Sequence, residues 1–217
     1  MKKFCLVILL SATAFASNAV NLVEKEYLAA AQKGDSVAQC QLGLCYRRGK
    51  NGVTKDYEKA VYWFRKSAAS GNAQAQWELG CAYATGRGVP KDFKQSVQWY
   101  RKSAEQGYPQ GQSKLGSCYM GGFGVPKDRE QAVYWFRKAA AQGDITAQVT
   151  LGRCYEHGLG VEKDVKQAIF WYRTAAGKAF VVEKEVARLC LSGTTSPALL
   201  VGECDKIQSS LSAARKK

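Results

Sequence analysis

Two kinds of hydrophobic pattern alternate along the middle of the chain. In the first, a leucine is followed four residues later by a tyrosine, as in Leu79 and Tyr83, so both side chains lie on one helix face. In the second, small residues flank a tryptophan at helical spacing, as in Ser96, Trp99 and Ser103. These patterns predict pairs of amphipathic helices, and no stretch predicts a strand.

The paired segments recur at a fixed period. The tryptophans are 36 residues apart, and the leucines that open each Leu-Gly pair follow at steps of 37, 36 and 36; they are Trp63, Trp99, Trp135 and Trp171, and Leu42, Leu79, Leu115 and Leu151. The extra residue of the first step falls in residues 49–52. A period of this length is typical of a stacked helical array. We therefore predict an all-α fold, an α-solenoid of about eleven helices in antiparallel pairs that form a right-handed superhelix.

Glycine, proline and aspartate separate the two helices of each pair. In the second repeat, residues 86–88 (Gly-Arg-Gly) end the first helix and Pro90 prevents its continuation. Asp92 is placed to cap the second helix, and Gln95 follows at the spacing of a capping box. A Gly-x-Gly turn also occurs in phosphate-binding loops, but the third glycine and the preceding strand are missing here. We interpret it as a helix stop.

Three further positions of the repeat have predicted places in the packing. A glycine after each leucine should let the partner helix approach closely. The four tryptophans should lie in the core, between layers. An arginine two residues after each tryptophan is about 200° farther round the helix and should face solvent; these arginines are Arg65, Arg101, Arg137 and Arg173.

The first 19 residues have the pattern of an export signal. Lys2 and Lys3 precede an apolar stretch, residues 4–15, that is too short to span a bilayer. Small residues allow cleavage after Ala16 or Ala19; an uncleaved anchor is the alternative. We therefore expect a periplasmic or secreted protein.

The rest of the chain divides around the repeats. We predict a capping helix at residues 20–34, four repeats at 35–178, and a degenerate fifth repeat with a C-terminal capping helix at 179–213. Terminal caps are expected because the end repeats of a solenoid must cover their exposed apolar faces.

The repeated motif is Ala-Gln-x-x-Leu-Gly-x-x-Tyr, then Gly-x-Gly-Val-Pro-x-Asp, then Ala-Val-x-Trp-Phe-Arg-Lys-Ala-Ala-x-x-Gly. In these residues the chain resembles the Sel-one-like repeat family, a relative of the tetratricopeptide repeat, and in particular its secreted bacterial members. The match covers residues 37–176 in four copies. The resemblance implies an exported, non-catalytic adaptor that binds other proteins in an envelope process or in host interaction.

The resemblance also implies where a partner would bind. In tetratricopeptide proteins the first helix of each pair lines a concave groove. The matching positions predict protein-binding residues at Leu44, Arg47, Arg48, Trp77, Cys81, Thr85, Ser113, Ser117, Met120, Arg153, Glu156 and His157. Trp77 stands where the other repeats have smaller residues, so we expect it to anchor a peptide, with three arginines as charge contacts. The alternative is that Trp77 packs between layers.

The charge balance narrows the class of partner. The chain has a net charge of +14, and +12 remain when the signal with its two lysines is removed. A basic protein attracts acidic partners, so we expect a protein or peptide with acidic and apolar groups; cell-wall polymers or anionic lipid are alternatives, as is a merely solvated surface. Export argues against nucleic acid. We expect a monomer.

Little in the sequence indicates catalysis. The single histidine, His157, excludes a multi-histidine metal site and is interpreted as a residue at a helix C-terminus. Some secreted cysteine-rich relatives have been linked to penicillin binding, but the chain lacks Ser-x-x-Lys and Lys-Thr-Gly motifs. We predict no enzyme activity and no cofactor. A cell-wall hydrolase or penicillin-binding enzyme, and a structural binder of anionic surfaces, remain the alternatives.

Seven cysteines follow the signal. Four of them share one repeat position, Cys45, Cys118, Cys154 and Cys190. The secreted relatives bridge each helical pair with two cysteines per repeat, a pattern this chain does not meet. Stacked helices lie about 9–10 Å apart, whereas a disulfide needs Cα atoms within about 7 Å. We therefore predict buried thiols, with Cys190 and Cys204 as the pair to expect if any bridge forms; without a Cys-x-x-Cys motif, a metal site is disfavoured.

Overall fold

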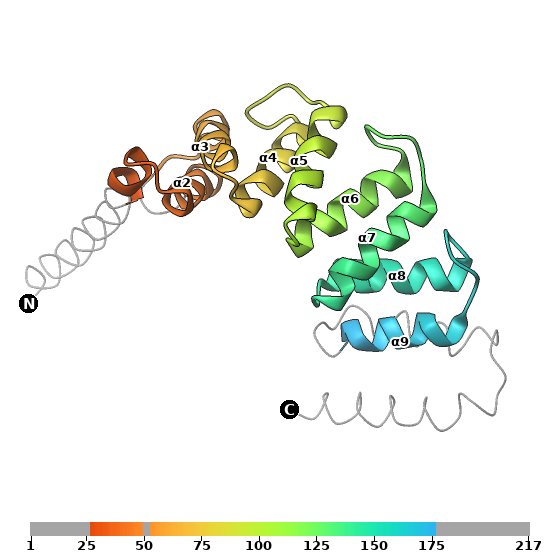
Figure 1. The fold of residues 1–217 in the computed structure, drawn as a ribbon. Coiled ribbons are helices and arrows are strands. Elements are labelled where there is room, and N and C mark those ends of the chain that lie inside the picture. Colours follow the sequence, from red (N-terminus) through yellow and green to blue (C-terminus); the bar gives the residue numbers. More distant parts are fainter. Residues whose placement is uncertain (1–26, 50–52, 177–217) are drawn as a thin grey trace, which may run out of the picture.

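The computed structural model describes residues 27–49 and 53–176. Helical residues 27–32 lead into eight helices, and no strand occurs in the described part of the chain. The helices are α2 (Ser36–Arg48), α3 (Tyr57–Ala69), α4 (Ala73–Thr85), α5 (Phe93–Glu105), α6 (Pro109–Gly121), α7 (Arg129–Ala141), α8 (Ile145–His157) and α9 (Val165–Ala176). Successive pairs stack along a curved array with α2 near one end and α9 near the other (Figure 1). The predicted all-α solenoid is confirmed.

The predicted helix stops and aspartate caps are confirmed as well. The capping box is not, because the Asp92 N–H donates to the carbonyl of Tyr83 at the end of the first helix and not to the Gln95 side chain. Each first helix ends at a glycine in the left-handed conformation, such as Gly86 after α4. Each second helix follows an aspartate that accepts a backbone N–H three residues on, as Asp92 accepts from Gln95 before α5. The start of α6 differs: Tyr108 at the N-cap makes no side-chain hydrogen bond to the helix, and Pro109 occupies the first turn. Local sequence therefore sets the bounds of these helices.

The core lies between the two helices of each pair. The four repeat leucines are fully buried, and an aromatic ring from the second helix packs onto the glycine that follows each leucine. A Cβ built on Gly43 would lie 2.6 Å from a ring carbon of Phe64, and one on Gly116 would lie 2.9 Å from the ring of Phe136. The close approach predicted from these glycines is thus confirmed, and the ring is what makes it necessary.

The tryptophans correct one prediction. Only Trp63 is buried, whereas Trp99, Trp135 and Trp171 are half-buried. The most buried ring is at the next position, occupied by Phe64, Tyr100, Phe136 and Tyr172, all 3% exposed or less. The physical reason is a rotation of about 100° per residue. This rotation points the second ring at the partner helix and leaves the tryptophan at the seam with the preceding repeat, where Trp99 packs against a cluster that includes Phe64 and Ala68 of α3.

The arginine series is exposed as predicted in three repeats, but it also links neighbouring repeats. Arg65, Arg101 and Arg137 are exposed, and each donates a hydrogen bond from Nη2 to a tyrosine hydroxyl of the following repeat. The N···O distances are 3.1, 2.9 and 2.8 Å, to Tyr83, Tyr119 and Tyr155. Arg173 in α9 is half-buried.

Buried glutamines provide a second link that the hydrophobic pattern does not reveal. Gln39, Gln76, Gln112 and Gln148 are each 5% exposed or less. Each donates its amide N–H to a backbone carbonyl eight residues earlier, at the end of the preceding helix, as Gln76 does to Ala68. These bonds satisfy carbonyls that a helix end leaves without an intrahelical partner.

Several predictions fall on residues that the structure does not describe. The export signal at 1–19, the first part of the capping helix at 20–34 and the segment 179–213 lie outside the described residues, as do Cys190 and Cys204. Among the described helices, none is long and apolar enough to span a bilayer.

Candidate functional site

A small cleft opens between α2 and α4, with α3 as its floor. Its volume is about 70 Å³. Three of the predicted protein-binding residues, Arg47, Cys81 and Thr85, come together in its lining. Two more charged side chains, Glu78 of α4 and Arg87 of the following turn, complete its polar wall. The apolar part comes mainly from α3 and includes the ring of Phe64.

An ion pair between a half-buried arginine and a buried glutamate lies in this wall. Arg47 Nη2 is 3.2 Å from Glu78 Oε1, and the Glu78 side chain is 2% exposed. Burial raises the pKa of the Glu78 carboxyl, and this effect exceeds the opposing attraction of Arg47 and Arg48. Arg47 Nε is also buried and has no hydrogen-bond partner. The guanidinium therefore uses one donor of the edge formed by Nε and Nη2 and leaves the other unsatisfied.

The thiol of Cys81 faces the same cleft but is not activated. The Tyr100 hydroxyl donates a hydrogen bond to Cys81 Sγ at 3.3 Å. Burial raises the pKa of Cys81 more than this bond and the nearby cations lower it. A thiolate is the reactive form, so the Cys81 thiol is a packing and hydrogen-bonding group. Among the described residues, no group of three or more His, Cys, Asp or Glu side chains is placed to hold a metal ion.

Trp77 lies outside the lining of the cleft. It is half-buried and packs against a cluster that combines Val97 and Tyr100 of α5, in its own repeat, with Leu115 of α6, in the next repeat. Its ring centroid is 6.0 Å from that of Tyr108, and its Nε1 is buried without a hydrogen-bond partner. The structure thus shows contact with the next layer, and half-burial leaves part of the side chain accessible. The anchoring role of Trp77 stays a prediction.

The other predicted groove residues divide by exposure. Arg48, Ser117, Arg153 and His157 are exposed, and Met120 is half-buried. Three are buried and offer little surface to a partner: Leu44, Ser113 and Glu156, at 6%, 4% and 7% exposure. These three side chains pack within the array because each helix is rotated so that they face a neighbouring repeat. A position carried over from a related family does not specify this rotation. Glu156, for example, accepts a hydrogen bond of 2.9 Å from the Tyr172 hydroxyl.

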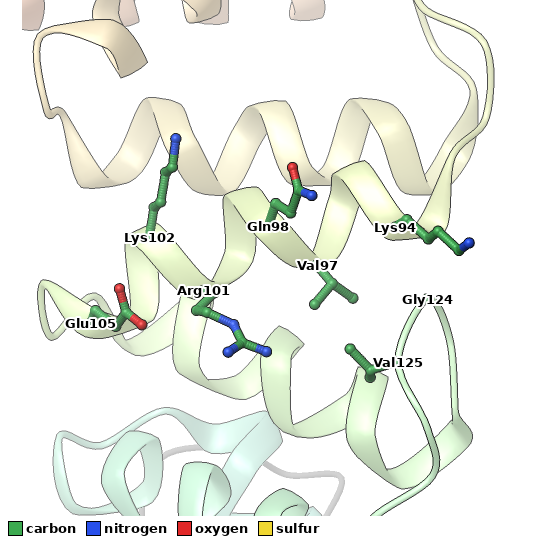
Figure 2. A pocket seen from close by; sticks show the side chains of 8 residues that line it. All are labelled: Lys94, Val97, Gln98, Arg101, Lys102, Glu105, Gly124 and Val125. Atoms are coloured by element: carbon green, nitrogen blue, oxygen red, sulfur yellow. The ribbon is translucent and has the colours of Figure 1, made fainter.

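A wider hollow lies along α5, the second helix of the second repeat. It is about 520 Å³ and open, and it is lined mainly by α5 and by Gly124 and Val125 of a later turn. Figure 2 shows Val97 and Val125 facing each other across it, with basic side chains of α5 around them. Its charged residues, Lys94, Arg101, Lys102 and Glu105, are all exposed. The hollow is a shallow basic surface, whereas the α2–α4 cleft contains buried polar groups.

Three polar residues of the cleft were not predicted from the sequence: Tyr57, Glu78 and Arg87. Of these three, only Glu78 could have been identified from the sequence. It directly precedes the repeat leucine, where the other repeats have Gln41, Lys114 and Thr150, so it is the only acidic residue at that position. Tyr57 and Arg87 lie beside helix ends, outside the positions carried over from the family groove.

Buried thiols are predicted to be reduced and slow to react, and the environments of Cys118 and Cys154 agree with this prediction. Cys118 and Cys154 are buried free cysteines, and burial raises the pKa of each to about 11. We expect alkylation of both in the native chain to be much slower than after denaturation, because little thiolate forms and access is blocked. Mass spectrometry after timed iodoacetamide treatment measures this; a Cys118–Cys154 disulfide in the unreduced protein would contradict it.

Known proteins share this architecture. The Sel1 repeat matches four segments, residues 36–72, 73–108, 109–144 and 145–179, which make up about two thirds of the chain. A protective antigen of uropathogenic Escherichia coli is 38% identical, with a TM-score of 0.74 over 78% of this chain and 36% of its own. A Sel1 repeat protein from Oxalobacter formigenes is 34% identical, with a TM-score of 0.73 over 79% of this chain and 68% of its own.

A curated relative shares a shorter region. HRD3A of Arabidopsis thaliana, an ERAD-associated E3 ubiquitin-protein ligase component, is 40% identical over 58 residues. These residues are 27% of this chain and 9% of HRD3A, so the chain spans only a small part of that relative. The four matched repeats, and the Oxalobacter protein covered over two thirds of its length, decide the assignment: the chain belongs to the Sel1 repeat family.

Proposed function

We propose that this protein is an exported adaptor that binds another protein through the surface formed by its first helices. Sel1 repeat proteins are protein-interaction adaptors. The proposed partner segment combines acidic and apolar groups. Export rests on the pattern of residues 1–19, and it places the function in the periplasm or outside the cell, in an envelope process or in host interaction.

The observation that carries the proposal is the cleft between α2 and α4. It joins accessible basic side chains to an apolar floor on the side of the array where the first helices lie. Arg48 and Arg153 add exposed positive charge on first helices, and Trp77 adds a half-buried aromatic side chain. Aromatic and arginine side chains are the residues in which binding energy concentrates at protein interfaces.

The test is a binding titration with a partner captured from envelope extract. Trp77→Ala should weaken binding by roughly 2 kcal/mol or more, mainly through faster dissociation, as at an interface hot spot. Arg48→Glu should slow association, and the effect should diminish as salt rises, because an exposed charge acts over distance and is screened.

A thermal melt of each variant is the control. Arg48 is exposed, so its replacement should leave the melting temperature nearly unchanged. If Trp77→Ala lowered the melting temperature strongly and left the affinity unchanged, Trp77 would be a packing residue only. Arg65→Glu, on an exposed second-helix position, is the matched charge reversal and should not change the association rate to the same degree.

A second candidate function, binding to anionic wall or lipid surfaces, is favoured by the distribution of charge. Each of α3, α5 and α7 contains three basic residues and one acidic residue, and α9 contains two basic residues and no acidic one. Among the first helices, α4 contains one acidic and no basic residue. Sedimentation with phosphatidylglycerol vesicles that is lost in Arg65→Glu and kept in Arg48→Glu would support this function over the adaptor.

A further inference from the structure

We propose that the α2–α4 cleft is the subsite for a carboxylate side chain of the partner, which binds the Nε–Nη2 edge of Arg47 in place of Glu78. This inference rests on the proposed function and names the chemistry of one contact within it. In the unbound protein Glu78 occupies half of that edge, and the partner's carboxylate would occupy both donors.

The donor geometry of Arg47 is the first argument. Nε and Nη2 lie on one edge of the planar guanidinium and can bind both oxygens of a carboxylate at once. Glu78 Oε1 is 3.2 Å from Nη2, while Nε is buried without a partner. A buried donor left unsatisfied costs free energy, so the resting arrangement is incomplete and a second carboxylate oxygen at Nε would complete it.

The size of the cleft is the second argument. About 70 Å³ lies next to this edge, which is the share of roughly two water molecules at about 30 Å³ each. A carboxylate head fits this space. A phosphate dianion is disfavoured, because its greater charge would lie beside the buried carboxylate of Glu78.

The positive charge around the opening of the cleft is the third argument. Lys55 and Arg87 lie over the ring of Tyr57, at 4.9 and 5.6 Å from its centroid. The pKa of Tyr57 is lowered, mainly by a hydrogen bond with Lys55 and further by Arg87 and Arg47. The cations Arg47, Lys55 and Arg87 thus outnumber Glu78, and the site favours an added negative charge.

Repeat packing does not require this ion pair. The positions of Arg47 and Glu78 correspond to Ala84 and Lys114 at the next interface. At the following one they correspond to Met120 and Thr150. Both of these interfaces form the same helical array without a counterpart of the pair. An ion pair with one buried partner is weak evidence for stability, which makes a binding role the better account of its place here.

The test uses a fluorescein-labelled peptide of ten glutamates as the probe and fluorescence anisotropy with the full chain. At an ionic strength of about 0.01 M, where screening is weakest, Arg47→Gln should weaken binding about tenfold, the worth of a charge-assisted hydrogen bond. Arg153→Gln and Lys94→Gln remove the same charge from exposed positions on a first and a second helix. Each should weaken binding by less than about twofold.

Two further variants separate geometry from charge. Arg47→Lys keeps the charge and removes the bidentate edge, so it should lose nearly as much affinity as Arg47→Gln. Glu78→Gln should tighten binding more than Glu105→Gln, which removes the same charge from an exposed position. Full affinity in Arg47→Lys, or equal effects of the two glutamate variants, would overturn the carboxylate subsite. Thermal melts confirm that each variant is folded before its affinity is compared.

The outcomes also distinguish the subsite from the adaptor function. Equal weakening by Arg47→Gln and Arg153→Gln, with Lys94→Gln unaffected, would refute the subsite and leave the first-helix surface as the binding face. Weakening by Lys94→Gln as large as that by Arg47→Gln would refute both. No measurable binding of the probe would refute the carboxylate chemistry, whereas binding of the captured partner would still test the adaptor.

Discussion

Replacing Phe136 by alanine is expected to lower the free energy of unfolding by about 3–5 kcal/mol, as for other large aromatic residues in cores. Its side chain is 1% exposed and packs onto Gly116 from the second helix of the pair. The cavity left behind is bounded by helix backbone at Gly116, which cannot supply a side chain to fill it.

The neighbouring positions provide the matched comparison. Trp135→Ala should cost less than Phe136→Ala, although tryptophan is the larger side chain, because Trp135 is half-buried at the seam between repeats. Arg137→Ala should cost about 1 kcal/mol, the worth of its hydrogen bond to the Tyr155 hydroxyl. Urea denaturation of the three variants measures the order; a larger loss for Trp135→Ala would show that the seam, not the helical pair, dominates stability.

Gly124→Ala is expected to destabilise the array by roughly 3 kcal/mol or more, through steric clash together with backbone strain. Gly124 has a φ of +73°, and an added Cβ would lie well under 3.0 Å from the backbone carbonyl of Phe93 in the preceding repeat. The turn that contains Gly124 is packed directly on the start of α5, and backbone cannot move aside as a flexible side chain can.

Gly107→Ala is the control for strain alone. Gly107 also has a positive φ, +84°, but no atom lies within 4 Å of an added Cβ. Its replacement should cost about 1–2 kcal/mol, the penalty of the left-handed conformation for an L-residue. The difference between the two variants in a denaturant melt therefore measures the contact between repeats. Equal losses would mean that the turn can withdraw from α5 at no cost.

The candidate site was predictable in part. The groove positions of the related family predicted Arg47, Cys81 and Thr85 as binding residues, and all three line the cleft. It also brought in Leu44 and Ser113, which are buried. A groove position specifies the helix face only approximately, and a rotation of a few tens of degrees decides whether a side chain meets solvent or the adjoining repeat. Glu78, which forms the ion pair with Arg47, is not among the predicted residues but directly follows one of them, Trp77.

The sequence by itself determined the period, the helix bounds and the caps, because these depend on contacts within a few residues: glycine with a positive φ, proline without an N–H, aspartate over a free helix end. Only the tertiary structure decided which aromatic ring fills each pair, where the tryptophans lie and that Arg47 meets Glu78. These outcomes depend on how one helix is rotated against the next, and that rotation is set by the close contact of Gly43 with Phe64 and its equivalents. A pattern of apolar positions is compatible with more than one rotation, and packing at full density selects one.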